Sequence, residues 1–153
     1  MTNCPERRAA KDFSFTDDGE KAVYRADIAK AYSEDAGVVQ YERTITLDRD
    51  QKVITLLDRY KLSRVSEGIT LPLISIAKPV VEKGKIIIPT RDSALEIAYN
   101  ESVFEIIAEQ HDMSDGKLQA SWKTDKVYRT LLKQAHPNNE GSLRIIMQEY
   151  IRK

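Results

Sequence analysis

The sequence of 153 residues predicts an all-β fold, an antiparallel layered β-sandwich of about ten short strands with one short helical turn near residues 27–32. Two observations predict it. Short runs in which apolar and polar residues alternate recur along the chain, and turn-forming residues separate them. β-Branched residues are concentrated in those runs, as the pleated surface of a sheet favours. The length is that of one domain large enough to bury a core.

The first predicted elements form a hairpin that leads into a helical turn. Apolar residues alternate over residues 13–15 and 22–26, on either side of an Asp-Asp-Gly turn at residues 17–19. Asp27 then stands where a carboxylate accepts hydrogen bonds from the free backbone N–H groups of one short helical turn, Ile28–Ala31.

The clearest alternation lies in two runs, Val38–Leu47 and Val53–Tyr60, which Asp48–Gln51 separates. The first run places five residues on one face: Val39, Tyr41, Arg43, Ile45 and Leu47. The second run has apolar residues on both faces, because Val53 and Leu57 stand opposite the main apolar set. A strand covered on both sides lies in the middle of a layered structure, so we expect the second run to be central.

Each of these two runs carries one charged residue on an otherwise apolar face, Arg43 in the first and Asp58 in the second. An unpaired buried charge is costly, so the structural interpretation is a cross-strand ion pair or two charges satisfied by backbone groups. The functional alternative is a pair that lines a saccharide groove. We favour the structural ion pair.

Five further strands are predicted in the middle of the chain. Ile69–Ile76 is an apolar run that Pro72 interrupts, which indicates an edge strand or a bulge, since proline cannot donate to a ladder. Residues 80–88 form a hairpin whose turn contains a glycine. Alternating runs follow at residues 95–99 and 104–108.

The last two elements, residues 127–135 and 143–151, are ambiguous between helix and strand. A turn at residues 114–116 precedes them, and the turn-rich loop His136–Gly141 separates them. The spacing of apolar residues in both elements suits helices, and Ser142 is a possible N-cap for the second. The family resemblance described below favours strands, and strands are the prediction adopted here.

Composition excludes several classes of protein. Lysine plus arginine equals aspartate plus glutamate at 24 each, so neither nucleic acid nor an anionic membrane is an expected partner. No apolar run approaches the roughly 18 residues needed to span a bilayer. Cys4 is the single cysteine, which excludes an intrachain disulfide. The first residues lack the apolar core of a signal peptide, so we expect either a cytoplasmic protein or a piece of a longer secreted precursor.

No catalytic or metal-binding constellation stands out. His111, His136 and Cys4 are far apart and have no metal-ligand spacing, so no metal and no cofactor is predicted. Nothing places Cys4 or a serine beside a histidine, as nucleophilic catalysis requires.

Two residues are candidates for contact with carbohydrate. Trp122 is the single tryptophan and lies in a polar stretch, where an exposed indole could stack on a sugar ring; the alternative is a half-buried ring that covers one end of the sheets. Arg129 is a candidate clamp for a carboxylate through its planar fork of donors.

Three blocks of sequence, in the same order and with similar spacing, resemble the C-terminal β-sheet domain of heparinase II/III-like polysaccharide lyases. The blocks together span most of the chain and are Arg7–Phe13; Asp27–Tyr32 with Arg43–Ile45 and Asp58–Tyr60; and Asp115–Leu118 with Trp122 and Val127–Arg129. The resemblance implies that residues 1–153 form a single β-sheet domain and that an N-terminal (α/α) toroid is absent. In the family the two parts together cleave acidic polysaccharides by β-elimination.

The resemblance also implies what this chain does alone. The family's catalytic Tyr and His lie mostly on the toroid, and His111 and His136 match no catalytic position, so no catalytic residue is transferred. We therefore expect a structural role as one wall of a cleft, catalytic inactivity of the isolated chain, and a periplasmic or secreted location within a longer precursor. The expected partners are the toroid and an acidic polysaccharide. The alternatives are a free-standing carbohydrate-binding β-sandwich and a scaffold held by protein contacts.

Overall fold

The computed structural model describes residues 10–65 and 67–150, and it confirms the all-β class. Cys4, residues 7–9 of the block Arg7–Phe13 and residue 151 of the predicted element 143–151 lie outside the described residues. The described part contains eleven strands, two 3₁₀ turns (η1 and η2) and one α-helix. The strands are β1 (Lys11–Asp17), β2 (Lys21–Asp27), β3 (Val38–Asp48), β4 (Val53–Leu62), β5 (Thr70–Ser75), β6 (Val80–Glu82), β7 (Lys85–Pro89), β8 (Ala94–Tyr99), β9 (Phe104–Asp112), β10 (Lys126–Gln134) and β11 (Glu140–Tyr150).

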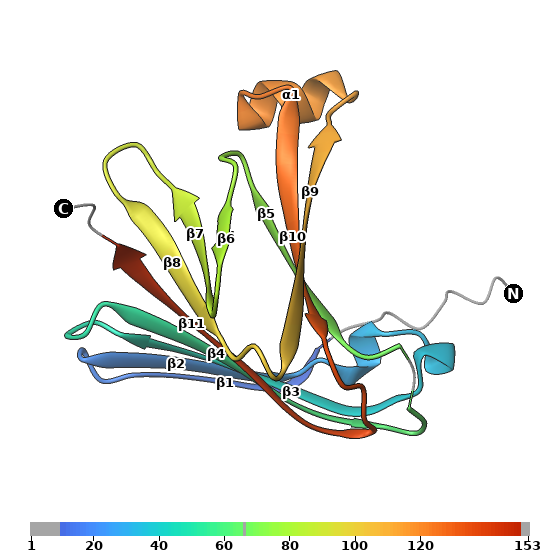
Figure 1. Ribbon diagram of the computed structural model, residues 1–153. Coiled ribbons are helices and arrows are strands. Elements are labelled where there is room, and N and C mark those ends of the chain that lie inside the picture. The colour runs from blue at the N-terminus through green and yellow to red at the C-terminus, as the bar shows by residue number, and fades with distance from the viewer. Residues whose placement is uncertain (1–9, 66, 151–153) are drawn as a thin grey trace, which may run out of the picture. The chain divides into compact units, whose positions relative to one another are not determined.

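The strands belong to two antiparallel sheets. One sheet has eight strands in the order β1-β2-β3-β4-β11-β8-β7-β6, and the other has three in the order β5-β10-β9 (Figure 1). The chain divides into two compact units, and β11 contributes to both, because residues 138–144 belong to the first unit and residues from 145 onward to the second. Unit 1 otherwise consists of residues up to 66, and unit 2 of residues 67–137. Each unit is described by itself.

Unit 1 contains a meander of β1 to β4, in which tight turns join β1 to β2 and β3 to β4. In the first turn Gly19 adopts a φ of +91°, and the Asp17 carboxylate accepts a hydrogen bond from its N–H at 3.0 Å. In the turn between β3 and β4 the Asp48 carboxylate accepts from the Gln51 N–H at 3.0 Å. The first is an Asx turn, and in the second the aspartate accepts from an N–H three residues on, so an aspartate helps to fix each point where the strands reverse.

The alternation predicted for β3 and β4 is present, with one correction at its start. Tyr41, Asp58, Tyr60 and Leu62 are buried, as the alternating pattern requires. The register between the strands shifts between residues 38 and 40, which leaves Val39 without a partner and 58% exposed. Val39 therefore does not belong to the buried face, because a β-bulge inserts one extra residue there.

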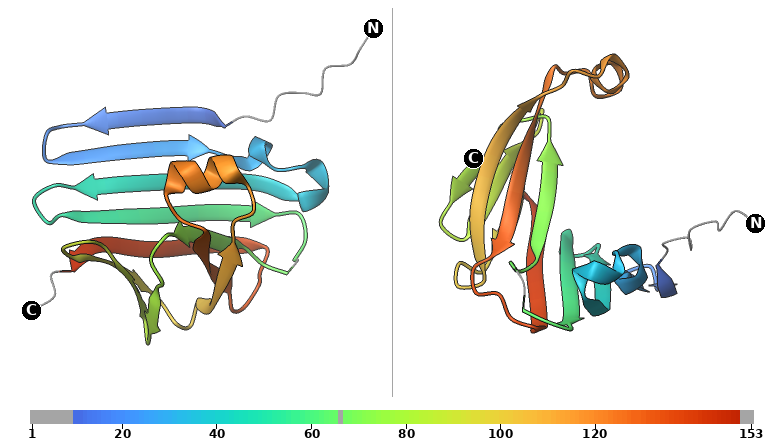
Figure 2. Two further views of the ribbon diagram at one scale, coloured as in Figure 1. Left: turned by 90° about the horizontal axis from the view of Figure 1, so that it is seen from above. Right: turned by 90° about the vertical axis from the view of Figure 1, so that its right-hand side faces the viewer.

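The helical turn predicted after Asp27 is present as η1 (Ala29–Ala31), and a second turn, η2 (Glu34–Ala36), follows it. The Asp27 carboxylate accepts a hydrogen bond from the Ala29 N–H at 2.9 Å. Gly37 ends η2 with a φ of +67°, and a Cβ at that position would lie 2.7 Å from the Ser63 Oγ. Both turns lie at one end of the meander (Figure 2), where they carry Tyr32 back onto β3.

Unit 2 contains the three-stranded sheet together with β6, β7, β8 and the second part of β11. Pro72 lies in β5, which is an edge strand, as the sequence predicts. Gly84 makes the turn between β6 and β7 with a φ of +74°. The core of unit 2 draws buried side chains from both sheets: Leu71, Ile86, Ile97, Phe104, Leu132 and Ile145.

The last two predicted elements are strands, β10 and β11, so the prediction adopted from the family resemblance is confirmed and the helical periodicity is misleading. β10 pairs along its length with both β9 and β5, and β11 pairs with β8 over residues 145–150. Hydrogen bonds to two neighbouring strands outweigh a local preference for helix in short segments.

One element of the structure departs from the sequence prediction. Residues 114–116 do not form a simple turn, because they begin a short helix, α1 (Gly116–Trp122). The Asp115 carboxylate accepts hydrogen bonds from the N–H groups of Lys117 at 2.8 Å and Leu118 at 3.0 Å. These hydrogen bonds make Asp115 the N-cap of α1. Aspartate favours the N-cap position, so the sequence contained a signal for the start of this helix. No helix within residues 10–65 and 67–150 is long and apolar enough to cross a bilayer.

The first testable prediction concerns the buried hydroxyl of Thr130. Thr130 is 1% exposed, and its Oγ1 has no hydrogen-bond partner among the described residues. A buried polar group without a partner lowers stability, so Thr130→Val, which keeps the shape and removes the hydroxyl, should stabilise the fold by about 1 kcal/mol. Urea unfolding measures the change. Thr70→Val on the exposed face of β5 is the control and should change little; a loss of stability in Thr130→Val would contradict the prediction.

Candidate functional site: the Arg43–Asp58 cluster and the polar depression of unit 1

The structure brings Arg43 and Asp58 together on neighbouring strands of unit 1. The two residues are directly opposite each other in the β3–β4 register. Arg43 Nε donates to Asp58 Oδ1 at 2.8 Å, and Arg43 Nη2 donates to Asp58 Oδ2 at 2.7 Å. Asp58 is fully buried, whereas the Arg43 side chain is 29% exposed. The pair is therefore bidentate, with its carboxylate inside and its guanidinium at the surface.

Two tyrosines complete this cluster. The Tyr41 hydroxyl donates to Asp58 Oδ2 at 2.8 Å, and the Arg43 guanidinium lies 5.9 Å from the centre of the Tyr41 ring. The Tyr32 ring stacks on the Tyr41 ring, with centres 5.6 Å apart and planes 28° apart. We call Tyr32, Tyr41, Arg43 and Asp58 the Arg43–Asp58 cluster.

The cluster shifts the acid–base properties of its members. Burial, and then the neighbouring Asp58 charge, raise the pKa of Tyr41 far above its usual range. The hydrogen bonds to Asp58 outweigh partial burial and raise the pKa of Arg43 as well. Tyr41 therefore stays protonated and Arg43 stays charged at every physiological pH, so neither acts as a proton acceptor here.

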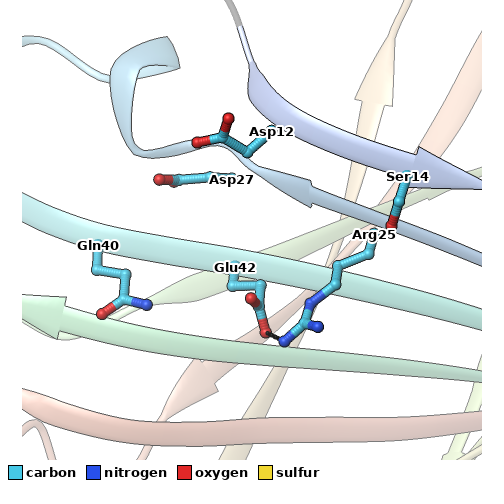
Figure 3. Close-up of a pocket in the computed structure, with 6 residues that line it drawn as sticks. All are labelled: Asp12, Ser14, Arg25, Asp27, Gln40 and Glu42. Carbon is cyan, nitrogen blue, oxygen red and sulfur yellow. Dashed lines mark hydrogen bonds and ion pairs between the residues drawn. The ribbon is translucent and has the colours of Figure 1, made fainter.

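A polar depression of about 410 Å³ lies on the opposite face of the same sheet. Its lining residues come from β1, β2 and β3 and are Asp12, Ser14, Arg25, Asp27, Gln40 and Glu42 (Figure 3). Arg25 Nη2 donates to Glu42 Oε1 at 2.7 Å, and this bond lowers the pKa of Glu42. Three carboxylates face one guanidinium, so the depression is acidic and disfavours an anionic ligand.

Arg129, one of the two residues predicted to contact carbohydrate, lies on β10 and faces Glu109 on β9. Its Nε and Nη2 donate to the same oxygen of Glu109 at 2.9 and 2.6 Å. His111 Nε2 lies 3.1 Å from that oxygen. Arg129 and then His111 lower the pKa of Glu109. Glu109 therefore occupies the Nε–Nη2 edge of Arg129, and only the Nη1 side of this guanidinium makes no hydrogen bond to the described residues.

Trp122, the other predicted contact, ends α1 at the tip of the β9–β10 connection and is 41% exposed (Figure 1). Trp122 belongs to α1 and Arg129 to β10, and contact of either residue with carbohydrate stays a prediction.

The described residues contain no group of three or more His, Cys, Asp or Glu that could hold a metal ion. His111 lies beside Glu109, and the backbone carbonyl of His136 accepts a hydrogen bond from the Gln134 side chain. Cys4 lies outside the described residues.

Sequence reasoning did not identify Tyr32 and Tyr41 as members of the cluster. Alternation placed Tyr41 on the same face as Arg43, which is a usable signal. Tyr32 comes from a separate turn, and a local pattern cannot predict a ring that reaches a strand from outside the sheet.

Comparison with known proteins gives a likeness of fold. No protein-family model and no curated protein sequence matches the chain. A mutant of heparan sulfate lyase HepC from Pedobacter heparinus is similar with a TM-score of 0.64 and 13% identity, covering 94% of this chain and 22% of that one. HepC itself gives 0.62 and 14% with the same coverage, and heparinase III gives 0.58 and 9%, covering 93% and 21%.

The fold is that of a segment of heparan sulfate lyases. This chain spans about a fifth of the length of the lyases that it matches. At 9–14% identity the likeness concerns the fold alone, and it agrees with the all-β family resemblance seen in the sequence.

The second prediction concerns the buried carboxylate. Asp58→Ala should lower the free energy of unfolding by about 3 kcal/mol, because it leaves Arg43 and the Tyr41 hydroxyl without their acceptor in a largely buried place. Thermal or urea unfolding measures the loss.

The matched control is Arg49→Ala, which breaks another bidentate pair, the exposed one with Asp17, and keeps the hydrogen bond from the Gly19 N–H to the Asp17 carboxylate. That variant should unfold close to the parent protein, since solvent screens its charges. Equal stability of Asp58→Ala and the parent would disprove a structural role for the buried pair.

Proposed function

We propose that the chain is the C-terminal β-sheet domain of a heparinase II/III-like polysaccharide lyase. The observation that carries the proposal is the fold shared with HepC over 94% of this chain. The order of three sequence blocks, ending in Trp122 and Val127–Arg129, supports it independently. The small share of each lyase that is matched, about a fifth, fits a larger domain elsewhere in the protein.

In this proposal the chain has a structural role as one wall of a cleft, and its partner is an N-terminal (α/α) toroid. The whole protein cleaves uronate-containing acidic polysaccharides by β-elimination, in the periplasm or outside the cell. Trp122 and Arg129 contribute contacts to the polysaccharide.

The isolated chain is catalytically silent in this proposal. β-Elimination needs a base beside the proton next to the uronate carboxylate. Tyr41 cannot serve, because burial keeps it protonated. Asp58 already accepts three hydrogen bonds and is fully buried. His111 lies next to Glu109 near the end of β9, and its side chain is 47% exposed to water.

A free-standing carbohydrate-binding module is the second candidate function. Exposed aromatic rings favour it, because Tyr32 is 42% exposed and Trp122 is 41% exposed. Such rings bind the C–H faces of sugars without any catalytic group.

The third prediction tests the lyase proposal directly. The reading frame upstream of Met1 should encode a toroid with its Tyr and His, and that longer protein should release unsaturated uronate from an acidic polysaccharide, measured by ultraviolet absorbance. The 153-residue chain alone should release none. A stop codon directly upstream, or product formed by the chain alone, would disprove the proposed role and favour the second candidate or an independent enzyme.

The fourth prediction concerns the single tryptophan. If Trp122 stacks on a sugar, saturating acidic oligosaccharide should quench or shift its fluorescence, because the ring loses water on binding. Arg129→Lys should weaken the response, since lysine lacks the planar fork. An unchanged spectrum at saturating glycan rules out contact by Trp122.

A further inference from the structure

The outer edge of the Arg43 guanidinium is held at the surface of unit 1. Arg43 uses Nε and Nη2 on Asp58, and within the described part of the chain its Nη1 makes no hydrogen bond. The side chain is 29% exposed, so this second edge faces solvent while the first is fixed against a buried carboxylate. A guanidinium fixed in this way loses little conformational freedom on binding a ligand.

An exposed aromatic ring contacts the same tyrosine as the Arg43 guanidinium. Tyr32 is 42% exposed, and its ring stacks on the Tyr41 ring with centres 5.6 Å apart. The Arg43 guanidinium lies 5.9 Å from the centre of that same Tyr41 ring. The exposed ring and the guanidinium therefore both adjoin Tyr41.

Ring and guanidinium together match the chemistry of an acidic sugar. The face of an aromatic ring packs against the apolar C–H groups of a pyranose, and a guanidinium edge donates to a planar carboxylate. We propose that Tyr32 and the outer edge of Arg43 form a subsite for a uronate residue of an oligosaccharide, with Tyr32 against the sugar ring and Arg43 on its carboxylate. Asp58 and Tyr41 act as positioning residues that fix the guanidinium.

Charge and pairing favour this surface over those at Arg25, Arg49 and Arg129. Arg49 donates through both Nη1 and Nη2 to Asp17 and a neighbouring carbonyl. Arg25 belongs to the acidic depression, which repels a carboxylate. Arg129 pairs with Glu109, whose side chain is 36% exposed, so its counter-ion is not fixed inside the protein as Asp58 is. Arg43 combines a buried counter-ion, a free edge and an adjacent exposed ring.

The identity of the ligand, a uronate, rests on the proposed function. The existence of the site rests only on the geometry of the Arg43–Asp58 cluster. Binding is therefore measured on the 153-residue chain by titration calorimetry, without any lyase assay. The probe is an unsulfated heparosan oligosaccharide, which carries carboxylates as its only anions. The same oligosaccharide with its carboxylates reduced to alcohols is the matched neutral ligand.

Two variants test the two halves of the subsite. Tyr32→Leu should weaken binding about fivefold through loss of stacking. Arg43→Lys should weaken it about tenfold, because a lysine that pairs with Asp58 has no second edge to offer. The matched controls are Tyr150→Leu, a similarly exposed tyrosine of unit 2, and Arg49→Lys, another carboxylate-paired arginine of unit 1. Both controls should bind like the parent protein.

Thermal unfolding of each variant shows whether it is folded. This check is needed because Arg43→Lys alters a partly buried ion pair and can destabilise the protein. Tyr32→Leu leaves that pair intact and carries the test if Arg43→Lys fails to fold. Loss of affinity in Tyr32→Leu, together with at least tenfold weaker binding of the neutral ligand, supports the subsite. Absence of binding by the parent, parent-like affinity of folded Tyr32→Leu, or equal binding of both ligands overturns it. The proposed function is tested separately, by the reading frame upstream of Met1.

Discussion

The buried carboxylate of Asp58 is the constraint around which unit 1 is organised. A charge with no exposure to water has to be neutralised and fully hydrogen-bonded, and three donors from two side chains of β3 meet that need. This requirement fixes the register of β3 against β4, because a shift of one residue would move Arg43 and Tyr41 to the wrong face. The position of Tyr32 follows, since its ring packs on the ring that Asp58 holds.

The two faces of the meander in unit 1 differ in the charged groups that they carry. One face contains the Arg43–Asp58 cluster, and the other contains the acidic depression lined in part by Arg25 and Glu42. Residues 42 and 43 are adjacent in sequence and point to opposite faces, so one strand supplies both environments. The cationic edge and the acidic depression are therefore kept apart by the sheet itself.

Sequence reasoning was strong where a pattern is local. The alternation in β3 and β4, the turn at Gly84 and the edge position of Pro72 follow from residue type and spacing. It was weak where one local signal fits two structures, as at Asp115, which both a turn and the N-cap of α1 accommodate. It was also weak where partners come from elsewhere in the chain. The strands β10 and β11 required the family resemblance, because their apolar spacing suits a helix and their ladders are formed with distant segments.

The first strand has a consequence for how the protein behaves at high concentration. β1 ends the order of the eight-stranded sheet, and its residues are exposed, with Phe13 at 73% and Phe15 at 62%. An apolar edge of this kind invites a second sheet to pair with it. The register of β1 is broken between Lys11 and Ser14, and Asp12 adopts a φ of +48°. This irregularity, with a charge at its centre, interrupts the row of backbone groups and so hinders the growth of fibrils from that edge.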